Sequence, residues 1–377
     1  MSDAPGRSPW LSALARLADA VESGADLLHH GVRSRVAGAR ALRVAAYRTY
    51  GTPRRFHVLG RVLRDAPAGA SEADATRWAN LLATYKRFET EEIPGARVRV
   101  AVAGVTREAS SDRDGYFDVA IEPPEPVGPG NHDVVVELLE PRGAEPVVGR
   151  TVVQVPAPTA RFGVVSDIDD TVIRTDVKEL ARMARSVLMG NAHTRLPFPG
   201  VAAFYRALRD GPDGKSSNPL FYVSSSPWNL YEMLEELFTL RGVPAGPFLL
   251  RDWGLSPSGS GGGGHAAHKG AHIRRLFETY PQLPFVLIGD SGQEDPEIYA
   301  QVIREHPGRV LAAYIRSVDR APARIAALGA LRDELHKEGA TLVVADDTLS
   351  AARHAAEKGW ILPAAADDVA RDVAATA

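Results

Sequence analysis

The sequence contains no cysteine and no long apolar run. The lack of cysteine excludes disulfides, zinc sites built on thiolates and a cysteine nucleophile. No apolar run reaches the roughly 18 residues that a membrane-spanning helix needs, and charged residues occur throughout the first part of the chain. We therefore expect neither a spanning helix nor a signal peptide, and a cytoplasmic location.

The chain also has little net charge. Its 44 basic and 47 acidic residues leave a formal charge of −3. This balance provides no overall attraction to nucleic acid or to an anionic membrane, so any basic surface must be local. With 377 residues, 45% of them hydrophobic, the chain is long enough for two or three domains with real cores. We expect no nucleic-acid partner, and the oligomeric state is left open.

Residues 1–53 are predicted to form an N-terminal helical segment. Apolar residues recur near helical spacing over residues 8–48, after a Ser-Pro start signal. Residues 31–48 contain several arginines and no acidic residue. A basic amphipathic helix can lie on an anionic membrane, which makes this stretch a candidate for peripheral membrane contact. The alternative is a helix packed on its own protein with its arginines in solvent.

Residues 54–158 are predicted to form a small β-sandwich accessory domain, with a helical insert at 70–91. Asp114-Gly115 predicts a hairpin turn between two of its strands. We find no catalytic set here and expect a docking or binding role, with calcium at Asp112 and Asp114 as an alternative. The expected strands are 57–63, 96–102, 116–121, 132–138 and 147–155.

Residues 159–377 alternate apolar strands with helices. Strands rich in Val, Ile, Leu and Phe with helical crossovers indicate a Rossmann-like parallel sheet with helices on both faces. Ligands of such sheets bind at the carboxyl ends of the strands. The expected strands are 162–166, 219–223, 284–289, 309–315 and 341–345. The expected helices are 177–189, 201–209, 228–240, 270–280, 296–306, 322–337 and 349–358.

The first strand ends in a pair of acids, Asp167 and Asp169. Because side chains alternate along an extended chain, both acids are expected on the same side. Two carboxylates held close together repel each other unless a cation lies between them, and Mg²⁺ suits oxygen ligands. The alternative is a polar turn in which Asp and Thr side chains cap a helix.

Two other segments carry groups suited to anions. Ser224 and Ser225 follow the second strand and open a helix predicted to begin at Trp228, where hydroxyls and free N–H groups can bind phosphate oxygens. Their alternative is a simple helix cap. Lys269 follows a glycine-rich loop, and its ammonium could reach the same crevice.

A further acid, Asp290, ends the third buried strand, and Asp295 lies one loop beyond it. Gly289 precedes Asp290 and is expected to permit the tight turn that aims this acid. Acids at the ends of neighbouring parallel strands should meet at one edge of the sheet.

This ordered set of motifs resembles the haloacid dehalogenase superfamily of phosphohydrolases, which use an aspartate nucleophile. In detail, the motif sequences resemble those of the catalytic domain of the actin-patch-associated phosphatidate phosphatase family, which is related to the lipins. This resemblance covers residues 160–350. The segments that carry this resemblance are Ser166–Ile173, Pro197–Gly200, Tyr222–Trp228 and Ile288–Tyr299.

The resemblance implies a role for each motif residue. Asp167 would be the nucleophile that forms an aspartyl-phosphate, and Asp169 the general acid and base. Mg²⁺ would bind Asp167, the backbone carbonyl of Asp169, and Asp290. Thr171 would steady the turn after the first strand.

The same resemblance assigns the remaining site residues. Ser224, Ser225 and Lys269 would hold the phosphoryl oxygens, and Asp295 would orient Lys269 or a metal-bound water. The expected function is hydrolysis of a phosphomonoester.

The expected substrate is phosphatidate. The stretches between the motifs leave no room for a large cap domain, and an open site suits a phosphate presented at a membrane surface. A phosphorylated lipid is thus the expected partner, with a peripheral membrane location. The alternatives are a phosphatase for soluble sugar or nucleotide phosphates, and a catalytically silent binding protein.

Overall fold

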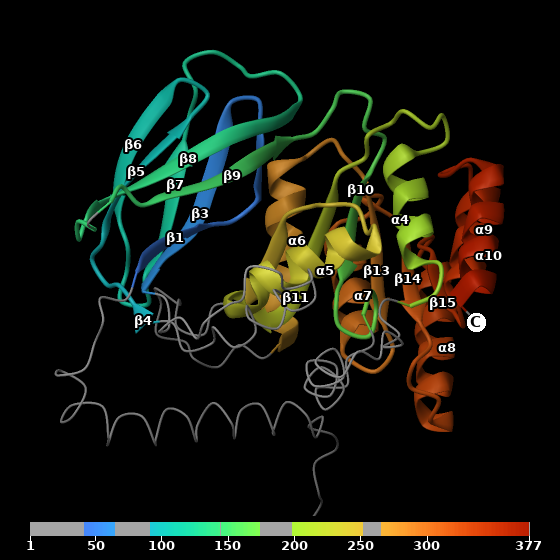
Figure 1. The fold of residues 1–377 in the computed structure, drawn as a ribbon. Coiled ribbons are helices and arrows are strands. Elements are labelled where there is room, and N and C mark those ends of the chain that lie inside the picture. Colours follow the sequence, from blue (N-terminus) through green and yellow to red (C-terminus); the bar gives the residue numbers. More distant parts are fainter. Residues whose placement is uncertain (1–40, 65–90, 144, 174–197, 252–264, 377) are drawn as a thin grey trace, which may run out of the picture.

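The computed structural model describes residues 41–64, 91–143, 145–173, 198–251 and 265–376. Within these ranges the chain forms two packed parts (Figure 1). We call residues 42–155 the β unit and residues 163–376 the α/β unit.

The β unit is antiparallel apart from one parallel pairing. Its strands run in the order β1-β3-β2-β9-β8-β5-β6, with β4 and β7 also paired to β3. Valines of β5 are buried while Arg97 and Arg99 are exposed, as expected for a sheet with one face in solvent. The strands are β1 (Leu42–Ala46), β2 (Thr49–Thr52), β3 (Arg55–Arg64), β4 (Glu91–Glu92), β5 (Arg97–Val102), β6 (Val105–Ser110), β7 (Tyr116–Ile121), β8 (Gly130–Glu140) and β9 (Val148–Val155).

Strands β1 and β2 occupy a stretch that the sequence analysis predicted to be helical. The helical pattern predicted over residues 8–48 is wrong at Leu42–Ala46, because β1 pairs along its whole length with β3. Strand β2 lies in the segment 1–53 that was assigned to the helical part, and it joins β3 to β9. The backbone hydrogen bonds supplied by these distant strands outweigh a weak local helical pattern. The membrane-contact helix proposed at 31–48 otherwise falls on residues 31–40, which lie outside the described residues, as does the insert 70–91.

The turn around Asp114-Gly115 is present, but it does not close a hairpin. It joins β6, which pairs with β5, to β7, which pairs with β3. The Asp112 carboxylate stabilises the turn by accepting the N–H groups of Asp114 and Tyr116 at 2.9 and 3.0 Å. In the described part of the chain, the acids close enough to share a metal do not include Asp112 or Asp114.

The α/β unit is built on a six-stranded parallel sheet. From β10 the chain builds outward through β11 and β12 on one side, then returns to place β13, β14 and β15 on the other. Such a reversal opens a crevice beside the central strand. Five strands were predicted, and β12 was not. The strands are β10 (Gly163–Asp167), β11 (Leu220–Pro227), β12 (Phe248–Arg251), β13 (Phe285–Asp290), β14 (Val310–Arg316) and β15 (Leu342–Ala345).

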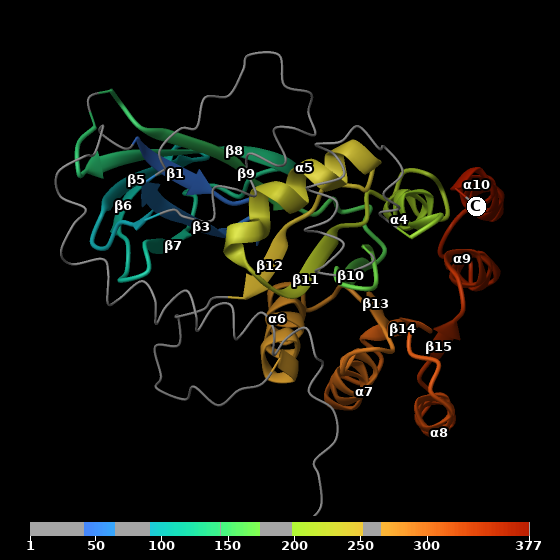
Figure 2. The same ribbon diagram turned by 60° about the horizontal axis from the view of Figure 1, so that its bottom comes forward.

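Helices cover both faces of this sheet, which confirms the predicted parallel α/β architecture (Figure 2). Helices α4, α5, α9 and α10 share one apolar core with the sheet, and α6, α7 and α8 share a second. Helix α10 was not predicted, and the helix expected at 177–189 lies outside the described residues. The helices are α4 (Val201–Asp210), α5 (Tyr231–Arg241), α6 (His265–Thr279), α7 (Asp295–Glu305), α8 (Pro322–Lys337), α9 (Thr348–Glu357) and α10 (Pro363–Thr376).

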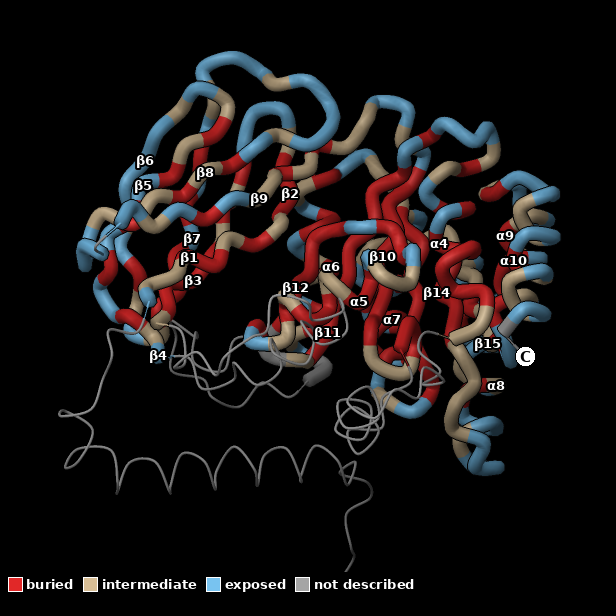
Figure 3. Tube along the Cα trace, in the orientation of Figure 1, coloured by how far each residue is buried: buried red, intermediate tan, exposed pale blue. Residues whose placement is uncertain are grey.

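The two units share buried surface. Tyr47 and Tyr116 of the β unit belong to the same apolar core as α4 and α5. Figure 3 shows the strands of the parallel sheet buried, while the outer sides of α9 and α10 are exposed. Among the described helices, none is long and apolar enough to cross a membrane.

Candidate active site

Three carboxylates meet at the carboxyl edge of the parallel sheet. Asp167 ends β10, Asp290 ends the adjacent strand β13, and Asp295 begins α7. One oxygen from each lies within 4.8 Å of the others, and all three side chains are buried. The predicted meeting of Asp167 and Asp290 is therefore present, and Asp295 joins them.

Lys269 supplies the positive charge in contact with this group. Its ammonium lies 2.7 Å from Asp167 Oδ1 and 2.6 Å from Asp295 Oδ1, with only 3% of its side chain exposed. Helix α6 begins at His265, earlier than the start predicted at residue 270, so Lys269 lies in its second turn and not just before the helix. Burial alone would lower the pKa of Lys269, but the carboxylates of Asp167 and Asp295 outweigh burial and raise it.

Burial acts against ionisation of the acids. It raises the pKa of Asp167 well above its usual range, opposed by Lys269 and reinforced by Asp295 and Asp290. Burial also raises the pKa of Asp290 to about 7, reinforced by Asp295 and opposed by Lys269. One ammonium therefore compensates three buried carboxylates only in part, and a further cation would favour their ionised forms.

The oxygens of Asp290 fit a metal. Asp290 Oδ1 accepts the backbone N–H groups of Gly292 and Gln293 at 2.6 and 3.1 Å, whereas its buried Oδ2 has no hydrogen-bond partner. Asp295 uses both oxygens within the protein, Oδ1 toward Lys269 and Oδ2 toward the N–H of Asp290 at 3.2 Å. A hard divalent cation therefore suits Asp290 and Asp167, while Asp295 contacts Lys269 and the backbone of Asp290.

Asp169 lies outside this carboxylate group. Its Oδ2 instead accepts the hydroxyls of Ser224 at 2.6 Å and Ser226 at 3.1 Å. The next residue, Asp170, has a φ of 55°, so the chain turns sharply and strand alternation ends after Asp167. Thr171 donates to Asp167 Oδ2 at 3.2 Å, as expected of a residue that steadies this turn.

The serines belong to a strand end and not to a helix start. Strand β11 runs through Pro227, a short 3₁₀ turn follows at Trp228–Leu230, and α5 begins only at Tyr231. The helix predicted from Trp228 thus begins three residues later. Ser225 is buried and its hydroxyl has no hydrogen-bond partner.

Ser226 is a site residue that the sequence analysis missed. Residues two apart on an extended chain point to the same side, so Ser224 and Ser226 both reach Asp169 while Ser225 does not. The signal was present in the Ser-Ser-Ser-Pro stretch. Because that stretch was interpreted as a helix start, the contact between Ser226 and Asp169 was not expected.

Gly289 is needed for a reason other than the predicted turn. It lies within β13 and does not adopt the left-handed conformation, but a Cβ there would lie 2.5 Å from Asp295 Oδ2. We expect Gly289→Ala to displace Asp295 and lower the free energy of unfolding by about 1–3 kcal/mol. Urea unfolding measures this change.

Gly329→Ala on α8 is the matched control, because a Cβ at Gly329 would meet no atom within 4 Å. This substitution should leave the free energy of unfolding unchanged or raise it by up to about 1 kcal/mol. Equal behaviour of the two alanine variants would contradict the packing requirement at Gly289.

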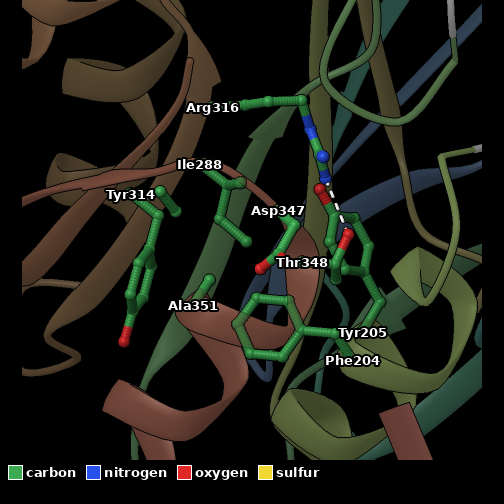
Figure 4. Close-up of a pocket in the computed structure, with 9 residues that line it drawn as sticks. Phe204, Tyr205, Ile288, Tyr314, Arg316, Asp347, Thr348 and Ala351 are labelled. Carbon is green, nitrogen blue, oxygen red and sulfur yellow. Dashed lines mark hydrogen bonds between the residues drawn. The ribbon is translucent and has the colours of Figure 1, made fainter. Parts of the chain in front are cut away.

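A separate cavity lies between the sheet and helices α4 and α9 (Figure 4). Phe204, Ile288 and Ala351 line it, and Arg316 donates to Thr348 Oγ1 at its edge at 2.9 Å. None of the three clustered carboxylates lines this cavity. The cavity is therefore separate from the carboxylate group.

Comparisons with known proteins cover part of the chain. A protein called phosphatidate phosphatase APP1 in Saccharomyces cerevisiae is 31% identical over 156 residues, which is 41% of this chain and 26% of that protein. An uncharacterized protein of Schizosaccharomyces pombe is 26% identical over 248 residues, 63% of this chain and 37% of that protein. The chain thus covers well under half of each relative's length.

A solved carbohydrate acetylesterase from Xanthomonas citri is 12% identical and aligns over 81% of this chain and 68% of its own, with a TM-score of 0.27. A score this low informs neither fold nor function. Residues 162–317, which carry the carboxylates, Lys269 and the serines, match the model of the family described as phosphatidate phosphatase APP1, catalytic domain.

Proposed function

We propose that the protein is a Mg²⁺-dependent phosphomonoester hydrolase with a haloacid-dehalogenase-like catalytic domain, and that phosphatidate is its substrate. The observation that carries the proposal is the meeting of Asp167, Asp290 and Lys269, buried at the carboxyl edge of a parallel sheet. This group lies inside the segment that matches a phosphatase catalytic-domain family.

In the first step, a carboxylate oxygen of Asp167 attacks the phosphorus of the substrate. A bond forms between that oxygen and phosphorus, and the bond from phosphorus to the leaving alkoxide breaks. Asp169 donates a proton to the alkoxide, which leaves as an alcohol. Thr171 and Lys269 hold the carboxylate of Asp167 from two sides, so its direction of attack is limited.

In the second step, water attacks the phosphorus of the aspartyl-phosphate. Asp169 takes a proton from the water, and the bond between phosphorus and Asp167 breaks, so inorganic phosphate leaves and the carboxylate is restored. The Ser224 and Ser226 hydroxyls, both on Asp169 Oδ2, orient this acid and base through the cycle.

The charges of the site favour binding of a metal together with a phosphate. Asp167, the backbone carbonyl of Asp169, and Asp290 would hold Mg²⁺. Such an ion reduces the repulsion between an attacking carboxylate and an anionic phosphate. Lys269, held by Asp295, adds a fixed positive charge beside the nucleophile, and Ser225 has an unused hydroxyl for a phosphoryl oxygen.

Metal dependence is tested with a soluble aryl phosphate and the full chain. Dialysis against EDTA should abolish phosphate release, and added Mg²⁺ should restore it, because Asp290 Oδ2 has no protein partner. Ca²⁺ at the same concentration is the control ion. Turnover that persists after chelation would overturn the metal requirement, and no turnover under any condition would favour the binding-protein alternative.

Substrate class is tested with a panel of esters at equal phosphate concentration. Phosphatidate in mixed micelles should be hydrolysed with a higher kcat/KM than glucose 6-phosphate or a nucleoside monophosphate, because the stretches between the motifs are too short for a large cap domain and a site without a cap suits a membrane-bound phosphate. Faster hydrolysis of the soluble esters would overturn the lipid assignment while leaving the phosphatase assignment in place.

A further inference from the structure

The β unit contacts the α/β unit directly behind the serine segment of the site. Tyr47, between β1 and β2, stacks on Trp228 with ring centroids 4.3 Å apart and planes 23° from parallel. Trp228 follows Ser226 by two residues. Both rings are at least 96% buried. The segment that carries the serines is thus contacted by Tyr47, a residue more than 170 positions earlier in the sequence.

A buried arginine makes a second connection to the same segment. Arg61 on β3 is 6% exposed, and its Nη1 donates to the side chain of Asn229 at 2.6 Å. Its other nitrogens donate to the backbone oxygen of Asp114 and to Glu92. These two contacts hold the guanidinium within the β unit, and the third connects it to the α/β unit. A guanidinium held on three sides acts as a rigid anchor.

The start of α5 is held in the same way. Tyr47 also packs on Tyr231, with ring centroids 4.6 Å apart. The Tyr231 hydroxyl accepts the backbone N–H of Arg48 at 2.8 Å, and Arg43 pairs with Glu232. Residues 228–232 are therefore bound along their length by the β unit.

Toward the carboxylates, the serines that precede residues 228–232 contact Asp169. The hydroxyls of Ser224 and Ser226 both reach Asp169 Oδ2, and the backbone N–H of Ser226 donates to Ser224 Oγ at 2.9 Å. Only Pro227 separates Ser226 from the anchored Trp228. A shift of Trp228 would therefore move the hydroxyls of Ser224 and Ser226 together.

We propose that the β unit is a positioning element of the catalytic site. Through Tyr47 and Arg61 it sets the place of residues 228–232, and these set the place of the serines that orient Asp169. The inference rests on the proposed function, in which Asp169 is the general acid and base. It assigns the β unit a role other than the docking or binding role expected from its sequence.

The size of the effect follows from the precision that proton transfer needs. A displacement of about 1 Å at a catalytic group costs on the order of 100-fold in rate. Ser225, proposed to contact a phosphoryl oxygen, lies in this segment, whereas Lys269 and the metal ligands do not, so KM should rise less than kcat falls. Loss of the anchor should therefore lower kcat by about 10- to 100-fold with a smaller change in KM.

The test is a double-mutant cycle in the full chain, with Mg²⁺ and a soluble aryl phosphate. Tyr47→Ala and Ser226→Ala should each lower kcat, and the double variant should be hardly slower than the worse single variant, because both act on one contact. Tyr47→Phe keeps the stacked ring and should retain kcat.

Tyr50→Ala is the matched control. Tyr50 is also a buried tyrosine of the β unit, but it packs on Phe221 near the start of β11 and on Tyr280, in the other apolar core from Trp228 and Tyr231. It should lower the free energy of unfolding as Tyr47→Ala does, while leaving kcat within about twofold and combining additively with Ser226→Ala.

Amide hydrogen exchange provides a readout that needs no activity. Tyr47→Ala should speed exchange in peptides that cover residues 224–230, and Tyr50→Ala should not. Unchanged exchange in Tyr47→Ala, or additive effects of Tyr47→Ala and Ser226→Ala on kcat, would overturn the inference. If the wild-type chain releases no phosphate from any ester, the proposed function fails, and the exchange experiment still decides whether the β unit positions this segment.

Discussion

Asp167→Asn is expected to lower kcat by about 10⁴-fold or more while the protein stays folded. The amide oxygen is neutral and a poor nucleophile, so the bond to phosphorus does not form. Folding should survive because the substitution keeps the shape of a buried side chain and because Lys269 retains its contact with Asp295 at 2.6 Å.

The stability of this variant is itself informative. Asp167 is a fully buried acid, and burial raises its pKa. Removal of its charge therefore reduces the repulsion in a cluster of three carboxylates and one ammonium. The melting temperature should stay equal to that of the wild type or rise, because one of three mutually repelling buried carboxylates is removed.

Phosphate release and thermal unfolding measure the two effects of Asp167→Asn. Asp118→Asn is the control, because this exposed acid on β7 lies in the β unit, paired with His57 at the surface. It should leave both quantities unchanged. Activity retained in Asp167→Asn would remove the covalent mechanism, and unfolding of that variant would show that the carboxylate is structural.

The second large effect is expected from Lys269→Met. The substitution keeps most of the side-chain volume but removes the ammonium that contacts Asp167 and Asp295 at 2.7 and 2.6 Å. Three buried carboxylates then face one another without a cation from the protein. Breaking a buried ion pair at one partner costs about 3–5 kcal/mol, so the free energy of unfolding at neutral pH should fall by that amount.

Urea unfolding of the metal-free protein measures this change. Lys337→Met on the exposed end of α8 is the matched control and should have no effect. The double variant Lys269→Met with Asp295→Asn should recover part of the loss, because it removes one of the uncompensated charges. A Lys269→Met protein as stable as the wild type would show that the acids are not ionised together in the folded state.

Most of the parallel sheet could be predicted from the sequence, because its strands are short apolar runs bounded by turn signals. The predicted strand at 284–289 lies within one residue of β13, and helix α8 matches its predicted range. Strands of four residues are at the limit of what a pattern can distinguish: β15 was predicted and β12 was not.

The site was partly predictable for the same reason. Asp167 and Asp290 stand at the ends of obvious strands, and parallel pairing of β10 with β13 brings such ends together. The contact of Asp169 with Ser224 and Ser226 was not predictable, because it follows from a sharp turn at Asp170 and from the continuation of β11 through Pro227. Neither feature has a local hydrophobic signal.

The sequence by itself indicated Asp167, Asp290 and Lys269 as candidate site residues, and that the two acids end parallel strands, because period and residue type are local properties of the chain. Only the tertiary structure decided that residues 42–52 are strands, that Gly289 makes room for Asp295, and that Tyr47 and Arg61 reach behind the serines. Those features depend on partners far away in the chain, and long-range packing overrides weak local preference.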